Sequence, residues 1–255
     1  MTASASPEPQ RRILVAVDVE KYSRRENLLQ YHIQEDFHRT LAEAAERLGL
    51  DRGAWLTQAA GDGELAVLPA AASEPRVVAH LATTLDELLR ARNAGLPGER
   101  HIRVRVAVHV GLVHLDGALG FPGAAAVVVS RLVDARPLKL ALAAFPAAGA
   151  ALILSEQVYD DVVAQRYEDL APEAFTPVRI ELADKGFDEA AWVRVPGAAP
   201  LDLARVLADF APSAPPPAGP AGSGSTYRID TLTTNGPAVF GDHGRAVSIN
   251  QEPSN

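Results

Sequence analysis

Five aliphatic residues in a row, residues 13–17, lead directly into Asp18 near the N-terminus. Successive side chains of a strand point to opposite faces, so a run without polar residues predicts a strand that is covered on both faces. Such a strand lies inside a layered fold, with other elements packed above and below it. Asp18 then lies at the carboxyl end of the strand, where ligands commonly bind in layered α/β sheets.

The segment after this strand has the pattern of an amphipathic helix. Ser23 and Glu26 have the spacing of a capping box, which predicts that the helix begins at Ser23. Gly49 supplies a helix stop. Apolar side chains recur every three to four residues between these limits, at Leu29, Ile33, Phe37, Leu41, Ala44 and Leu48. The sequence therefore predicts a helix of about five turns with one buried face.

A Gly-Asp-Gly turn, residues 61–63, stands between two short apolar segments. Glycine accepts the positive φ that tight two-residue hairpins require, so we expect strands through residues 55–56 and 65–68, with Asp62 at the tip. This placement presents a carboxylate beyond the end of the sheet. Asp-Gly is also a very common hairpin turn, so the alternative interpretation is an ordinary solvated turn residue.

The remaining segments continue the alternation of helices and strands. A helix opened by Pro75 precedes a strand of alternating apolar and basic residues, which we expect to bend at Gly111. The further expected elements are a helix at residues 124–135, a strand at 151–154, a helix from Ser155 to residue 162, and strands at 178–182 and 191–195. The order βαββαβ predicts an α+β fold, a split βαβ sandwich of the ferredoxin-like kind.

Composition divides the chain into four parts. Residues 1–10 are rich in Ser, Pro and Glu and are expected to be disordered, and residues 11–197 carry the predicted domain. Residues 198–225 are rich in Pro, Ala, Gly and Ser, as linkers are, although residues 201–210 have the pattern of one short helix. Residues 226–255 are β-prone and broken by turns, in a segment too small to fold as an independent globule.

The charge and composition exclude several classes of protein. The net charge of −8 argues against binding to nucleic acid or to an anionic membrane, because both are polyanions. The absence of cysteine excludes disulfides, thiolate zinc sites and cysteine nucleophiles. No uninterrupted apolar stretch of about 18 residues occurs, and the N-terminus lacks the apolar core of a signal peptide. We therefore expect a cytoplasmic protein.

The residues best suited to chemistry are two carboxylates and the start of the first helix. Asp18 and Asp62 fall on neighbouring elements of a split βαβ fold, and paired carboxylates suit hard cations such as Mg²⁺ that also bind phosphate oxygens. Ser23 would lie at a helix N-terminus, whose free N–H groups favour phosphate. Three basic residues lie beside it: Lys21, Arg24 and Arg25. Each feature has a plainer alternative (an exposed turn acid, a strand-end acid, a solvated helix start), but together they indicate a two-metal nucleotide site.

Several motifs share the order and spacing of one enzyme family. They are the strand ending in Asp18, the hairpin at residues 61–63, the apolar strand at residues 106–113, Gly123 followed by Arg131 on the next helix, and Lys185-Gly186 before the last strand. Over residues 11–195, the chain resembles the class III nucleotidyl (adenylate/guanylate) cyclase catalytic domain. In that family the active site forms between two protomers, so the resemblance implies a homodimer.

The resemblance also implies functions for individual residues. Asp18 and Asp62 would hold two Mg²⁺ or Mn²⁺ ions, which activate the ribose 3′-hydroxyl and neutralise the triphosphate of an NTP. Arg131 falls at the position of the catalytic arginine that stabilises charge in the transition state. Ser23 and Arg24 are expected to contact the substrate for a separate reason, namely the free N–H groups and positive charge at the predicted helix start.

The family's other substrate contacts are depleted in this chain. Val127 stands in place of the asparagine that binds the ribose, Gln58 in place of the base-selecting lysine, and Gly120 in place of its partner acid. Valine donates no hydrogen bond and glycine has no side chain, whereas Gln58 can still pair with a base edge. The first hypothesis is therefore a divergent cyclase-like domain that binds an NTP and is weakened in catalysis, in a signalling or conflict/defence system. The alternatives are an active cyclase that forms a 3′,5′-cyclic nucleotide and a non-enzymatic interaction adaptor.

Residues 234–244 resemble the short amyloid-like signalling motifs that bacterial and fungal immune proteins carry at chain ends. Such motifs assemble by cross-β stacking of like segments. The resemblance therefore implies homotypic assembly, or contact with a protein partner, through residues 226–255. The alternative is an unstructured tail in which the glycines have no function.

Overall fold

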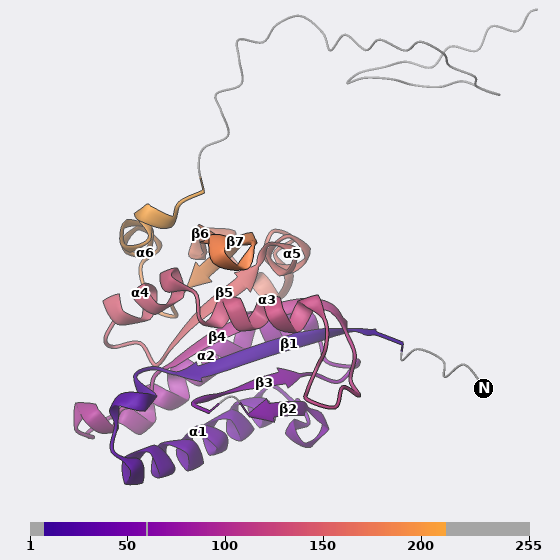
Figure 1. Cartoon of the computed structure of the whole chain (residues 1–255). Helices are drawn as coiled ribbons and strands as arrows, with labels where there is room; N and C mark the ends of the chain where they lie inside the picture. Colours follow the sequence, from indigo (N-terminus) through magenta and orange to yellow (C-terminus); the bar gives the residue numbers. More distant parts are fainter. Residues whose placement is uncertain (1–7, 60, 213–255) are drawn as a thin grey trace, which may run out of the picture. The chain divides into compact units, whose positions relative to one another are not determined.

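The computed structural model describes residues 8–59 and 61–212 of the 255-residue chain (Figure 1). Within these residues, seven strands form one sheet in the order β2-β3-β1-β4-β5-β7-β6. Neighbouring strands pair antiparallel except β4 and β5, which are parallel. The strands are β1 (Gln10–Val19), β2 (Leu56–Ala59), β3 (Gly63–Val67), β4 (Val104–Val113), β5 (Ala150–Ser155), β6 (Thr176–Leu182) and β7 (Phe187–Arg194).

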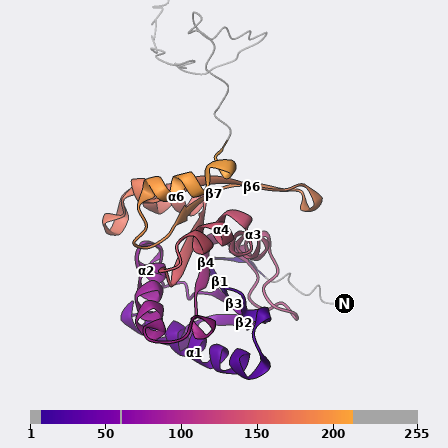
Figure 2. The same cartoon turned by 90° about the vertical axis from the view of Figure 1, so that its left-hand side faces the viewer.

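Helices cover both faces of the sheet, as Figures 1 and 2 show. The helices are α1 (Asn27–Arg47), α2 (Glu74–Asn93), α3 (Ala124–Val133), α4 (Arg136–Ala144), α5 (Glu156–Val158) and α6 (Pro200–Val206). In β1, Val15 and Val17 pack in the core that contains α1 and α2, whereas Leu14 and Ala16 pack in the core that contains α3 and α4. The predicted doubly covered strand is confirmed, and so is the α+β class with its βαββαβ core.

The first helix begins later than predicted. Ser23 lies in a 3₁₀ turn, Tyr22–Arg24, and α1 begins at Asn27. The backbone of Lys21 adopts a left-handed conformation (φ 56°), which turns the chain out of β1 into the 3₁₀ turn. No side chain caps this turn or α1, so Ser23 and Glu26 do not form a capping box. The prediction of a helix start at Ser23 is therefore wrong.

The two glycines of the predicted hairpin have different functions. Gly61 has a φ of +70°, the left-handed conformation expected of a tight turn. Gly63 is not left-handed; it lies in β3, where a Cβ atom would come within 2.2 Å of the carbonyl oxygen of Val17. Positive φ is therefore confirmed for Gly61 and wrong for Gly63, whose lack of a side chain instead permits β3 to approach β1.

β4 continues through Gly111, where the sequence predicts a bend. Gly111 pairs with Arg12 of β1, and a Cβ atom there would lie 2.8 Å from the Ala125 side chain of α3. The glycine thus lets α3 pack closely on the sheet and does not bend the strand. A further difference is α4, which the sequence pattern did not predict; Pro137 lies in its first turn, a position that proline favours.

The folded domain extends beyond the predicted boundary at residue 197. The short helix expected at residues 201–210 is present as α6 followed by a 3₁₀ turn. Leu203 and Leu207 are buried in the core that contains α3 and α4. The linker therefore begins later than residue 198, because these two leucines belong to the core.

Both ends of the chain lie outside the described residues. Residues 1–7 belong to the predicted disordered N-terminus, and residues 213–255 include most of the predicted linker and the whole of the β-prone tail. The prediction that residues 226–255 assemble therefore remains a prediction. No helix among the residues that the structure describes is long and apolar enough to cross a membrane.

Candidate functional site

The two carboxylates predicted to bind metal come from elements that meet at one end of the sheet. Asp18, the penultimate residue of β1, pairs with Gly63 of β3 on one side and with Arg105 of β4 on the other. The backbone N–H of Val19 donates a hydrogen bond of 3.0 Å to the carbonyl oxygen of Asp62. The tip of the hairpin therefore lies directly beside the carboxyl end of β1.

The Asp18 side chain is mostly buried and forms an ion pair across the strands. Its Oδ2 accepts a hydrogen bond from Nη2 of Arg105, and the side chains of Asp18 and Arg105 are 16% and 11% exposed. Oδ1 of Asp18 is buried and has no hydrogen-bond partner among residues 8–59 and 61–212. Burial raises the pKa of Asp18 to about 6; Arg105 opposes this shift, and the negative charges of Asp62 and Asp134 add to it. One oxygen of the carboxylate thus receives no hydrogen bond from the described residues.

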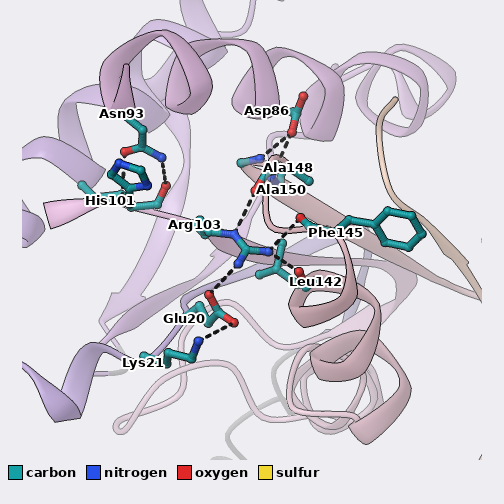
Figure 3. A network of polar contacts seen from close by, with 12 residues as sticks. Glu20, Lys21, Asp86, Asn93, His101, Arg103, Leu142, Phe145, Ala148 and Ala150 are labelled. Atoms are coloured by element: carbon teal, nitrogen blue, oxygen red, sulfur yellow. Dashed lines mark hydrogen bonds and ion pairs between the residues drawn. The ribbon is translucent and has the colours of Figure 1, made fainter. Parts of the chain in front are cut away.

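A second network of polar contacts fixes the chain just after Asp18 (Figure 3). Glu20 pairs with Nη1 of Arg103 at 3.2 Å. The same guanidinium donates to backbone carbonyls at the end of α4 and before β5, in Leu142, Phe145 and Ala148. These contacts join the end of β1 to β4 and α4. The chain directly after Asp18 is therefore tied to β4 and to the end of α4.

A pocket of about 560 Å³ gathers most of the other residues identified from the sequence. Its lining includes Gln58, Gly120, Val127, Arg131 and Lys185. They come from β2, the β4–α3 connection, α3 and the β6–β7 turn, which are far apart in the chain. Neither predicted metal ligand lines this pocket. The structure thus separates the carboxylates from the residues expected to contact the base, the ribose and the transition state.

Gln58 and Gly120 are direct neighbours in the pocket. A Cβ atom at Gly120 would lie 2.0 Å from Oε1 of Gln58, so the glutamine side chain fills the space that a side chain at position 120 would need. Gly120 also has a φ of +126°, which residues with a side chain rarely adopt. The two positions expected to select the base therefore meet in space, and only Gln58 contributes a side chain there.

α3 presents Val127 and Arg131 to the pocket from successive turns. The guanidinium of Arg131 lies 4.9 Å from the centre of the Phe187 ring, a cation–π contact that holds the charge at the pocket. Val127 is 46% exposed although it is apolar. The helix therefore supplies a cation to the pocket at Arg131. One turn earlier, Val127 supplies no hydrogen-bonding group.

The other predicted substrate contacts, Ser23 and Arg24, lie away from this pocket. Both residues are exposed, and Arg24 lines a different pocket of about 420 Å³ together with Lys21 and Arg25. Because α1 begins at Asn27, the N–H groups of its first turn do not lie at Ser23. The helix N-terminus expected at Ser23 is therefore absent there, and contact of Ser23 and Arg24 with a substrate remains a prediction.

The carboxylate pair fits a divalent ion that is shared with a ligand. Among residues 8–59 and 61–212, no group of three or more His, Cys, Asp or Glu side chains is placed to hold a metal ion alone. Mg²⁺ is usually bound by one or two carboxylates together with substrate phosphates. Asp18, with one unpartnered buried oxygen, and the neighbouring Asp62 provide that number of carboxylates.

No protein-family model matches the sequence, and no curated protein matches it. Among solved structures, the adenylate/guanylate cyclase/hydrolase from Silicibacter pomeroyi aligns with a TM-score of 0.54 at 19% identity, over 75% of this chain and 99% of that one. The fold is that of a nucleotidyl cyclase catalytic domain. The guanylate cyclase domain of RhGC from Catenaria anguillulae, solved in complex with GTP, has a TM-score of 0.48 at 14% identity, over 76% of this chain and 100% of that one. The resemblance identified from the motifs is confirmed at the level of the cyclase fold.

One half-buried histidine of this cyclase fold gives a prediction about pH and stability. His109 of β4 lies with Nδ1 2.8 Å from Oγ of Ser155, and burial, reinforced by the charge of Arg11, lowers the pKa of His109 to about 4. Between about pH 6.5 and pH 4 the unfolded chain binds a proton here that the folded chain does not, so stability falls as the pH is lowered through this window. After screening by solvent, the loss is about 2 kcal/mol.

Replacing His109 with glutamine is expected to remove the fall in the free energy of unfolding that protonation of His109 causes at low pH. The measurement is the free energy of unfolding in urea at about pH 7.5 and about pH 4.5, compared between the two proteins. Only the difference between the two pH values is used, because the substitution itself changes stability. An equal fall in both proteins would contradict the prediction.

Proposed function

We propose that this chain is a divergent class III nucleotidyl cyclase-like domain that binds an NTP with a divalent metal ion and is weakened in catalysis. The observation that carries the proposal is the pocket in which Gln58, Arg131 and Lys185 converge within a cyclase fold. The domain belongs, in this proposal, to a signalling or conflict/defence system in which residues 226–255 assemble or bind a protein partner.

The pocket offers complementary groups to the parts of a nucleotide. Arg131 and Lys185 are cations suited to phosphate oxygens. The amide of Gln58 both donates and accepts hydrogen bonds, so it can pair with the edge of either purine. Leu65 and Phe121 also line the pocket and provide apolar surface for a base. The ribose lacks a polar partner at Val127, which is the physical reason to expect weakened catalysis.

Asp18 and Asp62 are the residues proposed to hold the Mg²⁺ or Mn²⁺ ion. When bound, such an ion neutralises charge on the triphosphate and activates the attacking ribose hydroxyl. The chain contributes the unpartnered oxygen of Asp18 and the carboxylate at the tip of the hairpin. The contacts of Glu20 with Arg103 keep the end of β1 in place while the ligand binds.

A homodimer accounts for the distribution of these groups. The carboxylates do not line the pocket of their own chain, so we propose that the carboxylates of one protomer face the pocket of its partner. Leu119 lines the pocket and is 95% exposed, and Val127 is also exposed. Apolar side chains exposed beside a site suit burial by a second protein surface.

Two alternatives make different predictions in one experiment. The full chain is incubated with each NTP and Mn²⁺, and the mixture is analysed for a 3′,5′-cyclic product and for a thermal shift. Binding with little or no product supports the proposed function. Rapid product formation establishes an active cyclase. The absence of both product and thermal shift leaves a non-enzymatic interaction adaptor.

The proposed assembly of residues 226–255 has its own test. Sedimentation and thioflavin fluorescence of the full chain are compared with those of a chain that ends at residue 225. We expect assemblies only when residues 226–255, the last 30 residues, are present. The reason is that cross-β segments stack with like segments. A full chain that sediments as the shorter chain does would contradict the assembly.

Changing Val127 to asparagine is expected to restore a ribose contact. The position is exposed on α3 at the pocket, so the substitution should be tolerated. One added hydrogen bond corresponds to about a fivefold gain in affinity. Calorimetry should show this gain for an NTP and not for its 2′,3′-dideoxy analogue, whereas the wild-type chain should bind the two ligands almost equally. An equal gain for both ligands would argue against a ribose contact.

A further inference from the structure

Arg105 and Asp18 form a mostly buried ion pair, and within residues 8–59 and 61–212 no other side chain hydrogen-bonds to either of them. Nη2 of Arg105 bonds Oδ2 of Asp18, and both side chains are mostly buried. Nε of Arg105 and Oδ1 of Asp18 are each buried without a hydrogen-bond partner in the part of the chain that the structure describes. The guanidinium thus depends on one carboxylate oxygen, and the other oxygen of that carboxylate is left without a donor.

The backbone gives Arg105 little freedom to leave this position. It lies in β4, with β1 on one side and β5 on the other, and its Cα is paired with that of Asp18. If both oxygens of Asp18 turned to metal ions, the guanidinium would remain buried without a partner, which is unfavourable for a charged group. The ion pair is therefore expected to persist when the nucleotide binds.

We propose that Arg105 is a built-in cation that occupies one oxygen of Asp18, so that the site holds one divalent ion with its nucleotide rather than two. The inference rests on the proposed NTP and metal binding. The limit comes from the ligand atoms and not from the net charge, because the bound triphosphate is itself strongly negative. With Oδ2 of Asp18 held by Arg105, Asp18 has only Oδ1 left for a metal ion. Arg105 thus takes the place of the second cation that the resemblance implies.

The number of bound ions tests this inference directly. Mn²⁺ bound per protomer is counted by electron paramagnetic resonance in the presence of a saturating 3′-deoxy-NTP, which binds but lacks the attacking hydroxyl. We expect one Mn²⁺ for the wild-type chain and two for Arg105→Gln, because the freed oxygen of Asp18 becomes available. Arg105→Lys keeps the charge and should retain one ion.

A matched control is available beside the same sheet, where Arg52 of the 3₁₀ turn before β2 pairs with Glu64 of β3. Arg52 pairs with Glu64 at 2.6 Å, and its side chain and that of Glu64 are 15% and 14% exposed, so the pair is as buried as the one at Asp18. Arg52→Gln should leave the count at one. Two Mn²⁺ ions in the wild-type chain would overturn the inference and leave the proposed function standing. So would a single Mn²⁺ ion in an Arg105→Gln variant whose circular dichroism spectrum shows that it is folded. Absence of both Mn²⁺ and nucleotide binding in the wild-type chain would overturn the proposed function itself.

Discussion

Asp62→Asn is expected to lower nucleotide-dependent Mn²⁺ affinity by about 100-fold or more. A bound metal ion stabilises charge by several kcal/mol, and each factor of ten corresponds to about 1.4 kcal/mol. Asp62 lies at the tip of the hairpin beside the end of β1 and is partly exposed, so loss of its charge should remove a ligand without disturbing the core. If the wild-type chain forms a cyclic product, Asp62→Asn should form correspondingly less of it.

The measurement is Mn²⁺ titration at saturating 3′-deoxy-NTP, together with a thermal melt of each protein. Asp160→Asn is the matched control, because Asp160 is an exposed acid in the π-helical segment after α5, outside the candidate site. The melting temperature of Asp62→Asn should be unchanged or raised, because the substitution removes a negative charge close to that of Asp18. Unchanged Mn²⁺ affinity in Asp62→Asn would remove this residue from the metal site.

The sequence predicts the layered core of this domain because the relevant signal is local. Val15 and Leu14 must be covered on opposite faces, and the structure covers them with α1 and α2 on one side and α3 and α4 on the other. The start of α1 was predicted wrongly because the capping-box spacing is equally compatible with a 3₁₀ turn. The left-handed backbone of Lys21, which decides between the two, is not apparent from residue type.

In the candidate site, too, features set by nearby residues can be predicted from the sequence, whereas contacts between distant residues cannot. The motif spacing predicts that Asp18 and Asp62 come from neighbouring elements, and the structure places those elements together. The ion pair with Arg105 was missed because the partners are 87 residues apart. The only available signal was the alternation of basic with apolar residues before residue 106, which identifies a polar face but not the residue opposite. Strand register supplies that information.

The structure gives a physical reason for the glycine at position 120. From the sequence, it is a missing acid. In the structure it is a position whose φ favours glycine and whose side-chain space is filled by Gln58. An acid at position 120 would therefore require a strained backbone and a displaced Gln58 side chain. The sequence shows that both positions differ, but only the packing shows that they meet in space.

Arg131→Ala is expected to reduce nucleotide turnover, where turnover is detected, by about 100-fold to 1,000-fold. This is the usual effect of removing one group that stabilises charge in a transition state. Arg131 is held by Phe187 at the pocket, so its charge is positioned before the ligand binds. If the chain binds NTP without turnover, the same substitution should weaken NTP binding and have a smaller effect on the nucleoside, because the guanidinium is proposed to contact phosphate.

Arg136→Ala separates this effect from the loss of a cation–π contact. Arg136 of α4 lies 5.6 Å from the centre of the Phe210 ring, and it does not line the pocket of about 560 Å³. Both substitutions therefore remove a guanidinium from an aromatic ring, but only Arg131→Ala removes a charge from the proposed phosphate site. We expect similar small changes in melting temperature and a change in NTP affinity or turnover for Arg131→Ala alone. Equal effects of the two substitutions on the nucleotide would mean that Arg131 acts through packing, and the proposed site would then lack its catalytic cation.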